Sequence, residues 1–178
     1  AFNLLVRRYQ GRVYGVAVRM LGDPAEAEDV AQEVFVALHG ALSTFRGDAR
    51  VATWIFRITR NHCLNRLKFL SRRGRRTMGP QAHDEGRDPL DDVRSPAPGP
   101  LQVTEAAEEG RMIEAALLQL SPEHRELMLL REVEQLSYEE LGELTGLPEG
   151  TLKSRRRRAR AALLAHLPPV LQERLARG

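Results

Sequence analysis

The stretch SYEELGELTGLPEGTLKSRRRRAR, Ser137–Arg160, sets the architecture of the C-terminal half of this chain. Ser137 followed three residues later by Glu140 is a capping-box signature, which predicts the start of a short helix. Gly146 supplies a tight turn, and a second helix is predicted to begin at Pro148 or Glu149. Gly142 is small enough to let the partner helix come close. Two helices joined in this way predict a helix-turn-helix.

The charge of the chain changes abruptly at the second of these helices. Lys153–Arg160 carries six positive charges and no negative one, whereas Glu105–Glu149 holds three basic residues against twelve acidic ones. Such a change indicates that the second helix faces a phosphate backbone, so the sequence predicts a DNA-binding protein. Because a helix turns through most of a circle over eight residues, about half of these charges should contact phosphates or solvent rather than bases.

The composition limits the class of protein. With 178 residues, 42% apolar and 29% charged, the chain suits one large soluble domain or two small ones. No apolar run reaches 18 residues, so we expect no membrane span. Cys63 is the only cysteine, which fits a reducing cytoplasm.

No catalytic, metal or cofactor site is expected. His62 and Cys63 are adjacent on a predicted helix and therefore point about 100° apart, so they cannot act as a nucleophile and base pair. The other histidines are scattered without the spacing of a zinc site. We therefore expect a protein that binds other macromolecules and is not an enzyme.

The chain divides into two helical zones. No window alternates with period two, so we predict an all-α protein. Helical periodicity covers residues 1–70 and 104–167, and the segment 71–103 between them holds five of the ten prolines. We predict two small helical domains joined by a flexible linker, followed by a tail, 168–178, without a recognisable motif.

Three helices are predicted in the first zone, over Phe2–Leu21, after Asp23-Pro24, and over Val51–Leu70. Gly22 is expected to end the first helix and Asp23 to cap the second. The third helix lies in a stretch, 49–83, with nine basic residues and no acidic one. Its polar residues recur at spacings of 7, 4 and 7, which places in one line Arg50, Arg57, Asn61 and Lys68.

This basic stripe is a second candidate DNA-binding surface, because its cations can contact phosphates while the amide of Asn61 contacts a base edge. The alternative is an ordinary solvated helix face. The lack of acidic residues argues against that alternative, since exposed helices normally mix both signs of charge.

Two groups of motifs resemble the extracytoplasmic-function (ECF) group of bacterial sigma factors. The stretches similar to sigma region 2 are MLGDPAEAEDVAQEVF at Met20–Phe35, FRGD at Phe45–Asp48 and TWIFRITRN at Thr53–Asn61. Those similar to region 4 are LSYEELG at Leu136–Gly142, GTLKSR at Gly150–Arg155 and RAR at Arg158–Arg160. The pair, in this order and without a domain between them, is more specific than a helix-turn-helix alone.

The resemblance implies a subunit that binds core RNA polymerase and directs it to promoter DNA. It implies that Asp29, Gln32 and Glu33 dock on the clamp coiled coil of the largest polymerase subunit; an ordinary solvated helix face is the alternative. It further implies a cytoplasmic protein that associates with the nucleoid through polymerase, and an anti-sigma protein as a partner. A free-standing helix-turn-helix regulator, with an N-terminal dimerisation or sensing domain, remains the alternative function.

The resemblance also assigns DNA-facing residues. Those implied for the −10 element are Arg46, Arg57, Arg60, Asn61 and Lys68. Those implied for the −35 element are Lys153, Ser154, Arg155, Arg157 and Arg158. Trp54 can belong either to the core or to strand separation.

Two positions depart from the family pattern. Asn65 stands where many members have aspartate, so nothing is inferred from that position. Arg156 stands where an aliphatic residue is usual. Either the stem of Arg156 lies along the core with its head in water, which we favour, or the helix is slightly rotated.

Overall fold

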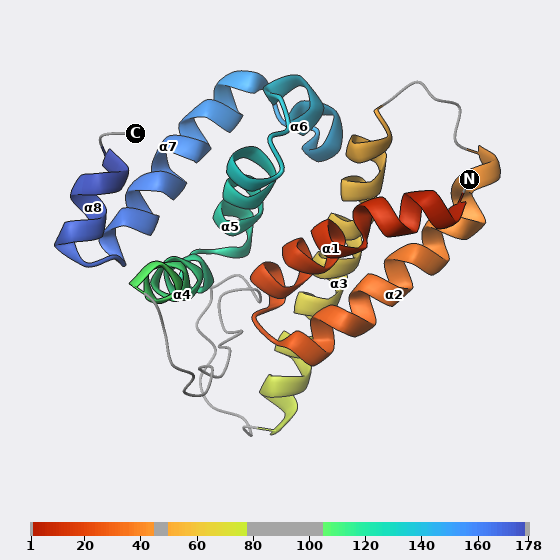
Figure 1. The fold of residues 1–178 in the computed structure, drawn as a ribbon, viewed down its shortest axis with the longest axis horizontal. Helices are drawn as coiled ribbons and strands as arrows, with labels where there is room; N and C mark the ends of the chain where they lie inside the picture. The colour runs from red at the N-terminus through yellow and green to blue at the C-terminus, as the bar shows by residue number, and fades with distance from the viewer. Residues whose placement is uncertain (1, 45–49, 78–104, 177–178) are drawn as a thin grey trace. The chain divides into compact units, whose positions relative to one another are not determined.

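The computed structural model describes residues 2–44, 50–77 and 105–176. The regular elements in these ranges are all helical, which confirms the predicted all-α class (Figure 1). The chain forms two compact units, residues 1–95 and 96–178. Among the described helices, none is long and apolar enough to cross a membrane.

Three long helices make up the first unit: α1 (Phe2–Leu21), α2 (Pro24–Ala41) and α3 (Val51–Thr77), with the 3-10 turn η1 (Leu42–Thr44) after α2. Each long helix packs against the other two (Figure 1). The buried side chains follow helical spacing on the facing sides, as a three-helix core requires. They include Val13, Ala17 and Met20 from α1, Val30, Val34 and Leu38 from α2, and Ile55, Phe56, Cys63 and Leu67 from α3.

The joint between α1 and α2 is built as the sequence predicts. Gly22 has φ +71° and its amide donates to the carbonyl of Val18 at 2.7 Å, so it closes α1 in the left-handed conformation that glycine adopts without strain. The Asp23 carboxylate accepts the amide hydrogens of Ala25 at 2.9 Å and Glu26 at 3.3 Å. These bonds cap α2 and fix the angle at which it leaves α1.

The predicted end of the third helix at Leu70 is wrong, because α3 continues to Thr77. The apolar periodicity fades near Leu70, but no proline occurs before Pro80 and basic residues are good helix formers. Ser71, placed in the linker by composition, is buried against the first unit. Most of the predicted linker, residues 78–103, lies outside the described residues.

The second unit begins with α4 (Glu105–Leu118), α5 (Pro122–Met128) and the π-helical turn η2 (Leu129–Val133). The predicted helix-turn-helix follows as α6 (Tyr138–Thr145) and α7 (Glu149–Ala165), and its start signals are confirmed. The Ser137 hydroxyl accepts the Glu140 amide hydrogen at 3.1 Å, and the Glu140 carboxylate accepts that of Ser137 at 2.8 Å. This is a complete capping box.

The turn between α6 and α7 explains why glycine occurs at positions 142 and 146. Gly146 has φ +74°, and its amide donates to the Gly142 carbonyl at 2.8 Å. A Cβ at Gly142 would lie 3.4 Å from the carbonyl oxygen of Leu147. The close neighbour of Gly142 is thus the backbone of the turn and not the partner helix itself, which corrects the prediction.

A buried arginine joins α4 to α5. The Arg125 guanidinium donates to the carbonyls of Leu117 at 3.0 Å, Leu118 at 2.8 Å and Leu120 at 3.0 Å. These carbonyls lie at and just beyond the C-terminal end of α4, where the regular hydrogen bonds of a helix stop. Burial lowers the pKa of Arg125 to about 10, so the side chain is still charged at neutral pH.

The C-terminal tail forms a helix, α8 (Pro169–Ala176), which the sequence did not predict. Helix α7 ends at Ala165, and Pro169 occupies the first position of α8, where proline is favoured. Leu171 is buried, and Arg174 pairs with Glu109 of α4 at 2.7 Å. The tail is therefore part of the second unit.

Candidate nucleic-acid interface

Helix α7 is held in place by one apolar ridge. Leu152, Ala159 and Leu163 are buried, at spacings of seven and four residues, which puts them on one line along the helix. The opposite side of α7 therefore faces solvent. Residues on or near that side include Lys153, Ser154, Arg157 and Arg158, four of the five residues predicted for the −35 element.

Arg155 and Arg156 lie on either side of the ridge and make ion pairs to the rest of the unit. Arg155 Nη1 is 3.1 Å from a carboxylate oxygen of Glu123 in α5, and Arg156 Nε pairs with the carboxylate of Glu132 in η2. These two pairs stabilise the orientation of α7 from both flanks. Arg155, which the resemblance assigned to the −35 element, thus also has a structural partner.

Arg156 keeps its head at the surface, because its side chain is half-buried and reaches Glu132. The hydrogen bond to Glu132 outweighs the opposing effect of burial and raises the pKa of Arg156. Since the ridge residue Leu152 is fully buried, α7 is not rotated away from its core. The rotated-helix alternative is therefore wrong, and the head group of Arg156 is held at the surface by an ion pair with Glu132.

The outward residues of α7 differ in their local contacts. Lys153 Nζ lies 2.6 Å from Glu149 one turn earlier, and the Ser154 hydroxyl donates to the Thr151 carbonyl at 2.9 Å. Arg158 Nε is 3.5 Å from the Ser154 carbonyl. Arg157 and Arg158 are exposed, and their guanidinium groups can turn toward a ligand without breaking an ion pair to another helix.

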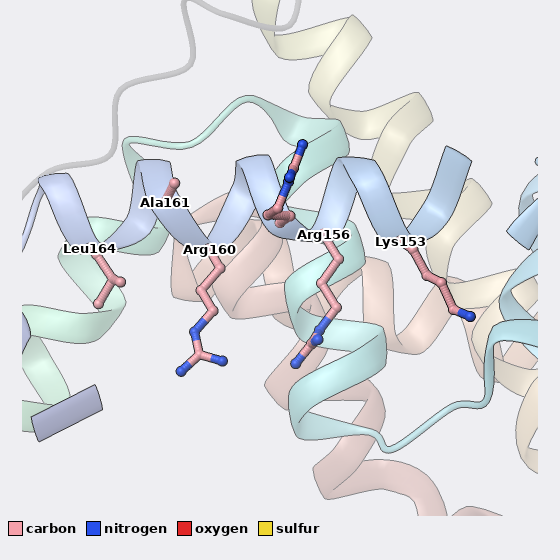
Figure 2. Close-up of a pocket in the computed structure, with 6 residues that line it drawn as sticks. Lys153, Arg156, Arg160, Ala161 and Leu164 are labelled. Carbon is pink, nitrogen blue, oxygen red and sulfur yellow. The ribbon is translucent and has the colours of Figure 1, made fainter. Parts of the chain in front are cut away.

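A basic groove of about 330 Å³ runs along one side of α7. Figure 2 shows Lys153, Arg156, Arg160 and Leu164 pointing to the same side of the helix. Arg157 and Ala161 complete the lining. Arg160 also donates to the Leu175 carbonyl of α8 at 2.6 Å, so one end of the groove is fixed to the tail helix. Cations at this spacing suit a row of phosphates.

His124, at the start of α5, lies beside the same helix. Burial, and then the positive charges of Arg155 and Arg158, lower the pKa of His124. The imidazole is therefore kept neutral where a further positive charge would be repelled. No local pattern predicts this effect, because His124 and Arg155 belong to different helices.

The predicted −10 residues lie on α3, except Arg46, which lies outside the described residues. Asn61 and Lys68 are exposed, and Arg57 and Arg60 are half-buried. Arg60 Nη1 lies 3.5 Å from the amide oxygen of Asn61. The basic stripe on α3 thus presents the amide of Asn61 with the guanidinium of Arg60 beside it. Trp54 is half-buried near the start of α3. This intermediate exposure is compatible with both of its predicted roles, core packing and strand separation.

The predicted docking residues lie on α2, but they are not equivalent. Asp29 and Gln32 are exposed, and Val36 on the same side is 75% exposed. Glu33 instead contacts α3: one carboxylate oxygen accepts from Arg66 Nη2 at 2.6 Å, and the other lies 3.4 Å from His62 Nδ1. Glu33 therefore belongs both to the exposed face and to the α2–α3 contact.

Arg66 is a site residue that the sequence patterns did not predict. It donates to Glu26 as well as Glu33, each at 2.6 Å, and so bridges two carboxylates one heptad apart on α2. Burial opposes its charge, but the two carboxylates outweigh that effect and raise the pKa of Arg66. The spacing of Glu26 and Glu33 is visible in the sequence; which cation of α3 faces them is not.

Comparison with known proteins accounts for both units. A family model described as Sigma-70 region 2 matches residues 5–73, and one described as Sigma-70, region 4 matches residues 110–163. The RNA polymerase sigma-H factor of Pseudomonas aeruginosa is 38% identical over 97% of this chain and 89% of its own length. The ECF sigma factor SigE of Mycolicibacterium smegmatis is 36% identical over 94% of this chain and 62% of its own length.

Two solved structures share the architecture. The sigma factor RpoE of Bartonella quintana, in complex with the anti-sigma factor NepR, superposes with a TM-score of 0.71 at 21% identity, covering 93% of this chain and 95% of that one. CnrH, in complex with the cytosolic domain of CnrY, gives a TM-score of 0.61 at 26% identity, covering 92% and 85%. With both sigma regions matched in order, this chain belongs to the sigma-70 family and, within it, to the ECF sigma factors.

Proposed function

We propose that this chain binds core RNA polymerase and directs promoter-specific initiation, with its first unit contacting the −10 element and its second unit the −35 element. The observation that carries the proposal is the presence of a basic helix surface in each of two separate units. On α3 the stripe lies in a stretch without acidic residues, and on α7 the cations are opposite the buried ridge. One promoter contacted at two places needs both surfaces.

The residue roles extend this proposal. In the second unit, Arg157 and Arg158 are the strongest candidates for base contacts, because both are exposed on the outer side of α7. The arginine fork can bind guanine O6 and N7 in a bidentate manner. Lys153 and Ser154 lie close by and suit phosphate contacts. Arg155 keeps its predicted place in the interface, where contact with DNA would compete with Glu123.

In the first unit, we assign to the −10 strand Arg57, Arg60, Asn61 and Lys68, together with Arg46. A base that has left the duplex exposes edges that are paired in the DNA double helix, and a protein side chain can form hydrogen bonds with them. The amide of Asn61 offers both a donor and an acceptor for such bonds. The cations around it suit the backbone of the same strand.

The polymerase-docking surface proposed here consists of Asp29, Gln32 and Glu33 on α2, around the exposed Val36. It combines negative charge with a central apolar side chain, which is the usual anatomy of a small protein interface. The clamp coiled coil of the largest polymerase subunit is the proposed partner. Arg66 and His62 would hold the Glu33 carboxylate in place before docking.

The free-standing regulator is disfavoured, because residues 5–73, which that alternative treats as a dimerisation or sensing domain, match sigma-70 region 2. Sigma factors are not an enzyme class, and we propose that the chain has no catalytic activity of its own. We further propose that it works in the cytoplasm, at the nucleoid when polymerase is bound, and that an anti-sigma protein restrains it by covering one of the cationic surfaces. The Bartonella protein was solved with such a partner.

Gel filtration of the chain with purified core polymerase, followed by run-off transcription, tests the proposal. We expect co-elution and transcription that depends on both the chain and a promoter. A regulator would instead bind duplex DNA alone, as a dimer on paired half-sites. Failure to co-elute with core polymerase would refute the proposed function.

A further inference from the structure

Helix α1 also carries an excess of positive charge. Its 20 residues contain four arginines and no acidic residue. Three of them, Arg8, Arg12 and Arg19, are spaced by four and seven residues, which places them in one line along the helix. Arg7 is adjacent to Arg8 in sequence but points about 100° away from this line. A surface helix usually mixes both signs of charge, so four like charges without an acid need an explanation.

The line of arginines lies on the side of α1 that meets α3. The Arg12 guanidinium carbon is 5.1 Å from the ring centroid of Phe56 in α3 and 5.2 Å from that of Tyr9. Arg8 lies 6.0 Å from the Tyr9 centroid. Attraction to two ring faces limits the positions that the Arg12 head group occupies. The α1 stripe (Arg8, Arg12 and Arg19) is therefore anchored at the junction of the two helices.

Arg60, which lies beside the α3 stripe, borders the same junction. Arg60 follows Phe56 by four residues, so it lies one turn further along the side of α3 that Arg12 covers. Arg60 is also next to the Asn61 amide oxygen, at 3.5 Å. Arg12 of α1 therefore lies against the side of α3 that also carries Arg60.

We propose that the α1 stripe is a further binding surface for single-stranded DNA, which continues the −10 surface of α3 onto α1. The inference rests on the proposed function, because it extends the strand held at α3. Charge complementarity selects a phosphodiester backbone as the occupant. A duplex is stiff over about 150 base pairs, whereas a single strand can follow a surface that passes from one helix to another.

Arg8 provides the cleanest test. It is exposed, so Arg8→Gln removes a charge without opening the core, and Arg7→Gln is the matched control that removes the same charge off the stripe. The chain, bound to core polymerase, is titrated with fork-junction DNA carrying either a short or a long single-stranded tail. The short tail ends at the −10 bases, and the long tail continues for several nucleotides. Salt dependence is measured for each probe.

We expect Arg8→Gln to weaken binding of the long-tail probe several-fold and to reduce the slope of log K against log salt by roughly 0.7, the value for one phosphate contact on a single strand. The short-tail probe and the Arg7→Gln variant should match the unmodified protein. Equal losses in Arg7→Gln and Arg8→Gln, equal losses with both tails, or no loss at all would each overturn the α1 assignment.

The outcomes also separate this inference from the proposed function. If the unmodified chain fails to bind core polymerase or either fork probe, the proposed function fails first. If it binds both probes and Arg8→Gln behaves like the unmodified protein, only the role of α1 fails. Fluorescence of Trp54, the single tryptophan, reports whether the first unit of each variant is folded.

Discussion

Replacing Arg66 with methionine should destabilise the first unit and weaken its docking on polymerase. Methionine keeps most of the aliphatic stem but removes the guanidinium that bridges Glu26 and Glu33, at 2.6 Å each. Glu26 then loses this partner on α3, whereas Glu33 keeps its contact with His62 at 3.4 Å. The two contacts are unequal, because the Glu26 side chain is 24% exposed and that of Glu33 is 49% exposed.

The expected loss of stability follows from this difference. A charge-assisted hydrogen bond in a partly buried site contributes roughly 1.5–3 kcal/mol, which applies to the Glu26 contact. The Glu33 contact is largely screened by solvent and contributes roughly 0.2–1 kcal/mol. Together they predict a loss of about 2–3 kcal/mol in the free energy of unfolding, after allowing for the cost of desolvating Arg66. With an m-value of about 1 kcal/mol/M, the urea midpoint falls by about 2 M or more.

Urea unfolding followed by fluorescence measures this loss for the first unit alone, because Trp54 is the only tryptophan and lies in α3. In double-mutant cycles, the coupling of Arg66→Met with Glu26→Gln should exceed that with Glu33→Gln. An unchanged midpoint for Arg66→Met would contradict the role given to this bridge. Asp29→Ala is the matched control for docking: it should impair co-elution with core polymerase and leave the Trp54 transition unchanged.

Three further predictions concern the second unit. Arg158→Ala should weaken −35-dependent initiation by about 1–3 kcal/mol and relax the preference at one base position; the same loss on every promoter variant in run-off transcription would show that Arg158 touches only phosphate. Ser137→Ala removes the cap of α6 and should lower the stability of the second unit by about 1 kcal/mol in a thermal melt followed by circular dichroism, whereas Ser137→Asp, which can also cap, should recover most of it. The pKa of His124 is lowered in the folded state, so the unfolded chain binds more protons. The stability of the second unit should therefore fall as pH drops below 6.5, the ordinary pKa of histidine. His124→Gln should reduce this pH dependence, and an identical pH profile for the variant would contradict the role given to His124.

Local features of the two units follow from the sequence alone. Capping residues, glycines with positive φ and apolar spacing act over a few residues, so the roles of Gly22, Asp23, Ser137 and Gly146 can be predicted from their neighbours in the chain. The switch from acidic to basic charge at Lys153 likewise marks α7 as the basic helix of the second unit. The ends of elements are harder to predict. Helix α3 runs past Leu70, because fading periodicity is a weak signal where no proline or cap stops a helix. The tail forms α8 because a proline pair can begin a new helix as well as end one.

Which charges face each other depends on the packing of the helices in three dimensions. Arg155, Arg156, Arg157 and Arg158 are the same residue type in one run, yet two pair with Glu123 and Glu132 while the other two face solvent. Glu33 and Arg66 are likewise far apart in the chain and meet only when α2 packs on α3. The physical reason is that a helix fixes the direction of each side chain, but the packing of one helix on another fixes what that side chain meets.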